Sequence, residues 1–198
     1  MKKLLIAFVL FSIPVVFFFY PEKVITYPAG ELAPDQPKQI SLAGDKKWQL
    51  EEYSIKALAE YDIKARVLSR NDFWLGEDSE LSPLDLALGW GPMSDQSVID
   101  KINISQRNRW YRWETDEQPI PPQQIALNSA NVHIIPKNQI VEDQLDKVYK
   151  GSLIQLKGYL VAITRADRWH WTSSLRRDDT AGGACELMWV EDVKIFDN

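Results

Sequence analysis

The sequence contains little sulfur and little histidine. Cys185 is the single cysteine among 198 residues, and His133 and His170 are the two histidines. One cysteine excludes a disulfide within the chain and a zinc site built from several cysteines. The nearby Asp178 and Asp179 lack the alternating spacing of a calcium-binding loop and are typical of turns. We therefore expect no metal ion and no cofactor.

The chain also lacks an excess of positive charge. Its 23 Lys and Arg residues are outnumbered by 28 Asp and Glu residues, which gives a formal net charge of −5. Affinity for nucleic acid depends largely on cationic side chains that neutralise phosphates. The composition therefore argues against a nucleic-acid partner, while a hydrophobic content of 45% is sufficient for a folded core.

A long apolar run occurs once, at the N-terminus. Lys2 and Lys3 precede residues 4–20, in which one serine and one proline are the only interruptions. About 17 to 25 apolar residues cross a bilayer. The run ends in bulky Phe and Tyr residues, which are unsuited to signal-peptide cleavage. The pattern favours an uncleaved signal anchor over residues 1–20 to a cleaved signal peptide.

The anchor predicts where the remaining chain lies. Residues 4–20 are expected to cross the lipid bilayer of a bacterial inner membrane once, with the two lysines in the cytoplasm and the C-terminal part in the periplasm. Residues 21–47 contain four prolines and two glycines and show no sustained period, so we interpret them as an extended stalk. Residues 48–198 are then the globular domain.

The domain is rich in strand patterns. Residues 53–67 place apolar side chains at every second position, which predicts one long strand or two strands with a bend. A helix also fits part of residues 50–65, and we prefer the strand for residues 62–68. Residues 152–163 form a second strand pattern around Gly158, and a glycine there indicates a bulge or a barrel corner. Residues 168–190 have the pattern of two strands joined by a turn.

Short helices are expected after Ser82-Pro83, over residues 96–102 and over residues 137–149. With the strands, they predict an α+β fold class. The expected architecture is a β-rich curved sheet or small OB-like barrel with two or three short helices, preceded by one transmembrane helix. The OB-like alternative is a fold analogy and implies no ligand by itself.

Two loops carry side chains suited to binding. In residues 88–95, Trp90 stands between two glycines, either as a plug packed onto the domain or as a platform for a ligand. Residues 176–183 are either simple turn formers or an exposed functional loop on a rigid hairpin. We predict that the two loops form one binding surface, which consists of Trp90, Asp95, Arg176, Arg177, Asp178 and Asp179.

Residues 107–113, RNRWYRW, interleave arginines with aromatic side chains. Such a pattern can bind single-stranded nucleic acid or an anionic glycan. A strand with exposed arginines and one apolar face is the simpler interpretation, which we prefer. The acidic composition and the expected periplasmic location further weaken the nucleic-acid alternative.

Three segments carry a resemblance to known proteins: LSPLDLALGWGPMSD, SANVHIIP and SSLRRDDTAGGACE. Together with the N-terminal apolar run, they resemble a family of uncharacterised bacterial proteins that are membrane-anchored or exported. The resemblance covers most of the chain after about Tyr53. It implies a location in the bacterial envelope, and it implies no catalytic residue because no activity is attached to the family.

Two functions remain open. The first is a non-enzymatic binding or assembly module that faces the periplasm and binds an envelope protein or a glycan. The second is a hydrolase or transpeptidase with Cys185 as nucleophile, His133 or His170 as base, and Arg176 or Arg177 at the oxyanion. An anchor before a β-rich domain is similar to sortases, but their arginine follows the cysteine and none follows Cys185. Because a free cysteine is commonly a small core residue, we prefer the first function.

Overall fold

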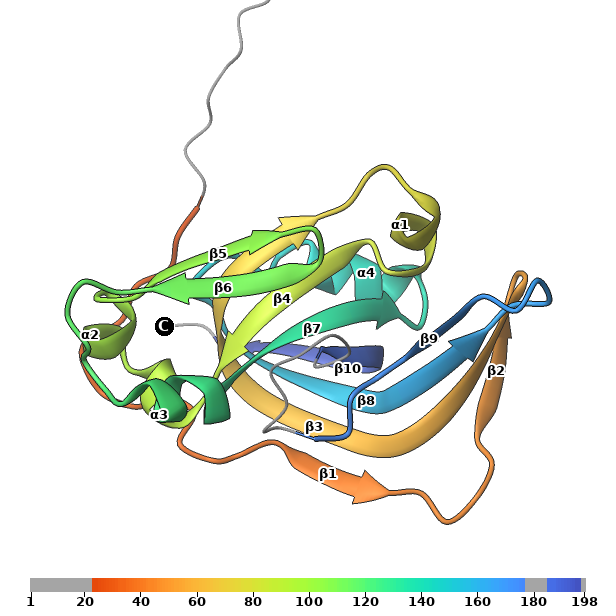
Figure 1. Cartoon of the computed structure of the whole chain (residues 1–198), viewed down its shortest axis with the longest axis horizontal. Coiled ribbons are helices and arrows are strands. Elements are labelled where there is room, and N and C mark those ends of the chain that lie inside the picture. The colour runs from red at the N-terminus through yellow and green to blue at the C-terminus, as the bar shows by residue number, and fades with distance from the viewer. Residues whose placement is uncertain (1–22, 177–184, 197–198) are drawn as a thin grey trace, which may run out of the picture.

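The computed structural model describes residues 23–176 and 185–196 (Figure 1). The predicted anchor and three predicted binding residues, Arg177, Asp178 and Asp179, lie outside these ranges. No helix within them has the length and apolar character that a membrane crossing requires. Strands predominate in the described part and its helices are short, which confirms the predicted β-rich α+β class.

Five strands pair edge to edge in a closed circuit, which we call the strand ring. In circuit order they are β3 (Tyr53–Asp72), β4 (Leu84–Gly89), β7 (Ser129–Pro136), β10 (Glu186–Phe196) and β8 (Leu153–Thr164). Neighbouring strands are antiparallel except β7 and β10, which are parallel. The circuit closes because β3 pairs with β8 along its first part and with β4 along its last part.

Strand β3 forms because apolar side chains occupy every second position. Tyr53, Ile55 and Ala57 are buried, whereas Ser54 and Lys56 between them are exposed. Alternate side chains of a strand point to opposite faces, so this pattern turns one face of β3 toward the core. The predicted strand is confirmed, and it continues beyond the predicted end as far as Asp72.

The interior of the strand ring is filled by aliphatic side chains from all five strands, among them Ile63, Val67, Leu86, Ile134, Leu156 and Met188. Helix α4 (Gln139–Leu145) packs Val141 and Leu145 against this cluster. The Asn138 side chain accepts a hydrogen bond from the Val141 N–H at 3.1 Å, which caps the start of the helix. The helix predicted over 137–149 is therefore confirmed, although it is shorter.

Further elements lie outside the ring. Strands β1 (Lys38–Ser41) and β2 (Lys47–Leu50) pair with β3, and β9 (His170–Thr172) pairs with β8. A separate hairpin of β5 (Asn103–Arg107) and β6 (Trp110–Glu114) lies beside β4 (Figure 1) and contacts β3 and β7. The short helical elements are α1 (Glu77–Leu81), η1 (Gly91–Ser94), α2 (Gln96–Ile99) and α3 (Pro122–Leu127).

One predicted helix is wrong. Ser82-Pro83 favours a helix start, but the following residues 84–89 form strand β4, and all six of them are buried. A short apolar run that is buried on both faces fits a central strand as well as a helix. Pairing with β3 on one side and β7 on the other decides for the strand.

The segment that precedes the domain lies along the strand ring. β1 pairs with β3 from Lys38 to Ser41, and Ala33 belongs to the core cluster of the ring. The backbone N–H groups of Leu32 and Ala33 donate to the Ser94 hydroxyl at 3.1 and 3.0 Å. Residues of the predicted stalk are therefore hydrogen-bonded to strand β3 and to the Ser94 side chain of the domain.

Candidate functional site

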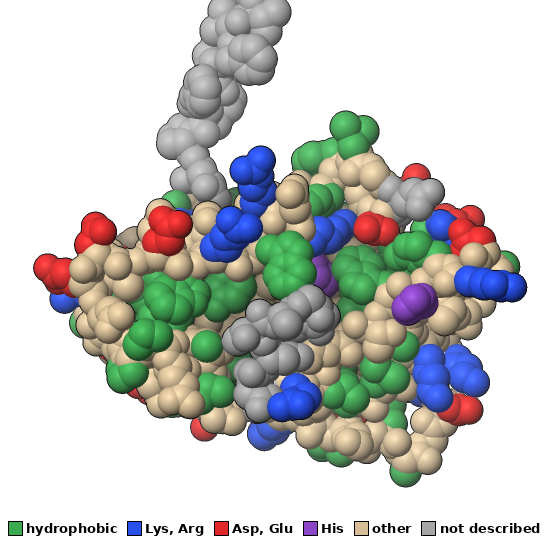
Figure 2. Space-filling model, in the orientation of Figure 1, with side chains coloured by type: hydrophobic (Ala, Val, Ile, Leu, Met, Phe, Trp, Pro, Cys, Tyr) green, Lys and Arg blue, Asp and Glu red, His purple; other side chains and the backbone are tan. Residues whose placement is uncertain are grey.

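A cavity of about 380 Å³ lies between the β5–β6 hairpin and the strand ring, and we call it the hairpin pocket. Its volume is within the usual range for small-molecule sites. Figure 2 shows that hydrophobic side chains are exposed together on the face that carries the hairpin. The side chains that define the pocket are Trp110, Tyr111, Trp113, Asn131, Arg176, Cys185 and Glu186.

Aromatic side chains from β6 supply the apolar part of the pocket. Trp110 is 41% exposed, whereas Tyr111 and Trp113 are half-buried. These two side chains pack against a second cluster of buried hydrophobic residues, which includes Leu68, Ala87 and Ile125. The Tyr111 hydroxyl lies 2.6 Å from the Ser129 hydroxyl. Burial raises the pKa of Tyr111, against the opposing effect of the hydrogen bond with Ser129. The phenol therefore stays neutral, and the pocket has an apolar wall with a hydroxyl at its base.

The polar part of the pocket comes from β7 and the start of β10. Asn131 donates a hydrogen bond to the Arg109 carbonyl at 3.0 Å and accepts one from Gln106 at 2.7 Å. The Cys185 sulfur lies 3.9 Å from both the Asn131 amide nitrogen and the Arg109 carbonyl oxygen. Glu186 is buried at 4% exposure. The amide of Asn131 thus links the ring to the hairpin that covers it.

An ion pair between the buried Asp85 and the partly buried Arg109 holds the hairpin turn against the ring. Arg109 donates to Asp85 at 2.8 Å and to the Ser82 carbonyl at 3.0 Å, and its guanidinium lies 3.8 Å from the centre of the Phe73 ring. The Nδ1 atom of His133 is also 2.8 Å from Asp85, but in an orientation that makes this an electrostatic contact rather than a directed hydrogen bond. The negative charge of Asp85 is therefore compensated mainly by the guanidinium of Arg109.

The turn itself is built for this contact. Asn108 and Arg109 have φ angles of 52° and 64°. Two central residues with positive φ are characteristic of the type I′ turn, whose twist suits a two-residue hairpin. A non-glycine residue with a positive φ angle has a higher conformational energy. The ion pair of Arg109 with Asp85 offsets this energy. At the tip of the hairpin, Arg109 is therefore the side chain that holds the turn against the ring.

The two predicted loops meet only in part. Trp90 and Arg176 both line the hairpin pocket. Trp90 is 1% exposed and belongs to the core cluster, so it is a plug rather than an exposed platform. Asp95 caps α2 instead and is not among the side chains that line the pocket.

The two histidines of the enzymatic alternative lie in different surroundings. His133 is buried beside Asp85, and its ring packs against Trp171 with the ring centres 4.8 Å apart. His170 is exposed on β9, with Nδ1 3.4 Å from the Arg168 carbonyl. The neighbours given above for the Cys185 sulfur are an amide and a carbonyl oxygen, and neither can act as a general base.

Sequence reasoning missed the role of the hairpin. The alternation of arginines and aromatics in residues 107–113 was informative, but it was interpreted as one strand with exposed arginines. The structure divides this segment between β5, a turn and β6, and brings β6 over β7. Asn131 carried no signal of its own, because a lone asparagine in a strand pattern indicates no site.

Asp95 provides a pH-dependent contribution to stability. Its carboxylate accepts hydrogen bonds from the Gly30 N–H at 3.0 Å and the Ser97 N–H at 2.8 Å. The bond from Gly30, with those from Ser97, lowers the pKa of Asp95. The contribution is thus fully present above the unfolded pKa of about 3.9 and is lost as the pH falls through the lower folded value.

Replacing Asp95 by alanine is expected to lower the free energy of unfolding by about 1 kcal/mol at neutral pH, the usual effect of losing a helix cap. Urea titrations of the wild type and the variant, repeated toward acid pH, measure this difference. It should shrink once the carboxylate is protonated. A difference that stays constant down to acid pH would contradict the assigned role of the charge.

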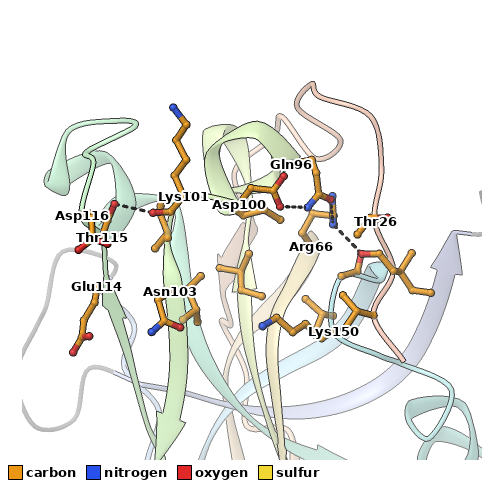
Figure 3. A pocket seen from close by; sticks show the side chains of 18 residues that line it. Thr26, Arg66, Gln96, Asp100, Lys101, Asn103, Glu114, Thr115, Asp116 and Lys150 are labelled. Carbon is orange, nitrogen blue, oxygen red and sulfur yellow. Dashed lines mark hydrogen bonds between the residues drawn. The ribbon is translucent and has the colours of Figure 1, made fainter. Parts of the chain in front are cut away.

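A larger cavity, of about 620 Å³, lies between the base of the hairpin, α2 and residues 24–26 (Figure 3). At its edge the buried Arg66 donates to the Gly151 carbonyl at 2.8 Å and to Gln96 at 2.9 Å, and its guanidinium lies over the Tyr27 ring at 4.5 Å. Burial lowers the pKa of Arg66. Since these contacts tie the N-terminal segment to the ring, we assign Arg66 a structural role.

Comparisons with protein-family models, with curated proteins and with solved structures return no match. Among the residues in the two described ranges, no three His, Cys, Asp or Glu side chains converge as metal ligands do. The candidate site therefore depends on the geometry of the hairpin pocket alone.

Proposed function

We propose that this chain is a membrane-anchored, non-enzymatic binding module of the bacterial envelope and that the hairpin pocket holds a glycan. The observation that carries the proposal is the aromatic lining formed by Trp110, Tyr111 and Trp113 beside the exposed side chain of Arg176. The C–H face of a sugar ring packs on an aromatic ring, and its hydroxyls pair with amide and guanidinium groups. Concave sites with apolar walls and a few placed polar groups are the usual form of ligand sites.

The strand order supports the same proposal. We interpret the strand ring as an OB-like barrel, because it has five strands, one parallel pair and a helix between its third and fourth strands. In OB folds the face of the second and third strands binds oligosaccharides or oligonucleotides. Here those strands are β4 and β7, and the β5–β6 hairpin lies over them. This is an analogy of fold, and the net charge of −5 favours a glycan over a nucleic acid.

The proposed location rests on the N-terminal sequence. Two lysines followed by the apolar residues 4–20 have the features of a single-pass signal anchor that leaves the domain in the periplasm. A glycan of the cell envelope is accessible there. The anchor would therefore place the hairpin pocket in the compartment that contains its proposed ligand.

The alternative function, a hydrolase or transpeptidase that uses Cys185, needs a base close to the sulfur. Treatment of the native protein with a thiol-reactive probe separates the two functions. An activated thiolate reacts much faster than an ordinary cysteine, because the thiolate is the nucleophile. An ordinary or slow rate at Cys185 removes the enzymatic alternative.

Replacing Trp110 by alanine is expected to weaken binding of bacterial cell-wall glycan fragments by about tenfold, because one aromatic contact contributes about 1 kcal/mol or more. Calorimetry on the full chain in detergent measures this change. Trp74→Ala is the matched control, since Trp74 is also exposed but lies outside the hairpin pocket. Equal affinities of the two variants, or no binding by the wild type, would contradict the proposal.

A further inference from the structure

The loop between β3 and β4 exposes two adjacent large apolar side chains. Trp74 is 87% exposed and Leu75 is 92% exposed, the highest values among the large hydrophobic residues of the described chain. Single exposed hydrophobic residues are common on soluble proteins, but an adjacent pair at a loop tip indicates a surface that another phase or molecule covers.

The base of this loop is held rigidly. Phe73 lies under the Arg109 guanidinium at 3.8 Å, and its backbone N–H donates to the Pro83 carbonyl at 2.8 Å. Helix α1 follows, where the Ser82 N–H bonds to the Asp78 carbonyl at 2.9 Å. The apolar tip is therefore presented outward by a fixed frame, and its exposure is a property of the fold.

The tip lies on the edge of the molecule at which the described chain begins. Figure 1 shows the loop before α1 and the first described residues, which continue into the grey trace, along the same upper edge. Residues 4–20 end only three positions before Lys23. Three residues span at most about 10 Å, so an anchor in residues 4–20 would hold this edge next to the bilayer surface.

We propose that Trp74 and Leu75 enter the interfacial layer of the bilayer that holds the anchor, as a second membrane contact of the domain. Tryptophan is enriched at this depth because its ring is apolar and its N–H is polar. Asp78 and Glu80 of α1 carry charges that favour water, so only the loop tip enters. Two separate contacts fix the tilt of the domain relative to the bilayer, which a single contact does not. The inference rests on the proposed function, because it requires the anchor.

The experiment uses the full chain in lipid nanodiscs, with a fluorescent NBD group on Trp74→Cys in a Cys185→Ser background. Ile40→Cys is the matched control, because Ile40 is a hydrophobic residue with 59% exposure on β1, at the opposite edge of the molecule (Figure 1). We expect a spin-labelled lipid with a shallow nitroxide to quench the probe at 74 at least about twofold more than the probe at 40, and aqueous iodide to show the reverse order.

Two results with the probes overturn the inference. Equal access of iodide to both probes shows a tip in water. A probe at 74 that is shielded from iodide but not quenched by the lipid shows a protein partner or a second copy of the chain. Alkaline extraction of the same preparation tests the anchor separately. Release by alkali overturns both the anchor and the loop contact, whereas retention with an iodide-accessible probe at 74 overturns only the loop contact.

Discussion

Replacing Arg109 by alanine is expected to lower the free energy of unfolding by about 3–5 kcal/mol, the range found when one partner of a buried ion pair is removed. The Asp85 side chain is 1% exposed and its Oδ1 atom accepts the guanidinium at 2.8 Å. Without Arg109, a buried carboxylate keeps only the undirected contact with His133. Chemical denaturation followed by tryptophan fluorescence measures the loss.

The same substitution is expected to release the hairpin tip from the ring. Arg109 also holds the Phe73 ring and the Ser82 carbonyl, so binding in the hairpin pocket should weaken together with stability. Arg107→Ala is the matched control, because Arg107 is exposed on the same hairpin. A loss below about 1 kcal/mol, the level of an exposed ion pair, would show that Asp85 does not depend on Arg109.

Replacing Gly158 by alanine is expected to cost about 3 kcal/mol or more, at the upper end of overpacking effects. A Cβ atom at this position would lie 1.9 Å from the Trp189 carbonyl oxygen and 3.0 Å from its carbonyl carbon. These are backbone atoms of the neighbouring strand and cannot rotate away. The variant can fold only if β8 and β10 separate here, where they close the strand ring.

Thermal unfolding of the Gly158 variant, compared with Gly44→Ala, checks this prediction. A Cβ atom at Gly44 meets no atom within 4 Å, so that substitution should be neutral or slightly stabilising through the unfolded chain. Similar midpoints for the two variants would show that the ring tolerates a wider β8–β10 gap. The close approach at Gly158 would then not be required for folding.

The sequence predicted several elements correctly because their patterns are local. Alternation over residues 53–67 identified β3, and the helical period with a following glycine identified α4. Gly158 indicated a bulge or a barrel corner, and the pairing of β8 with β10 shifts register between Val190 and Asp192 opposite this glycine. For β3 and α4, the residues that carry the pattern are the residues that form the element.

The sequence failed where distant pairing decides. Residues 84–89 are mostly apolar and show no clear periodicity, so the sequence does not distinguish a strand from a helix. The segment is a strand because it pairs with β3 and β7. Residues 107–113 indicated exposed arginines, but one of them, Arg109, is paired with the buried Asp85. The sequence also grouped Asp95 with Trp90, although Asp95 caps α2. A local sequence pattern does not indicate which side chain of a distant strand a residue will contact.

The residues alone therefore determined the fold class, the positions of β3 and β8 and the expectation of an N-terminal anchor, because side-chain periodicity and hydrophobic length are properties of a continuous segment. Only the tertiary structure decided that hairpin side chains contact β4 and β7 and that Trp90 and Arg176 share one pocket. The physical reason is that strand pairing joins segments far apart in sequence through backbone hydrogen bonds, which every residue type except proline can form.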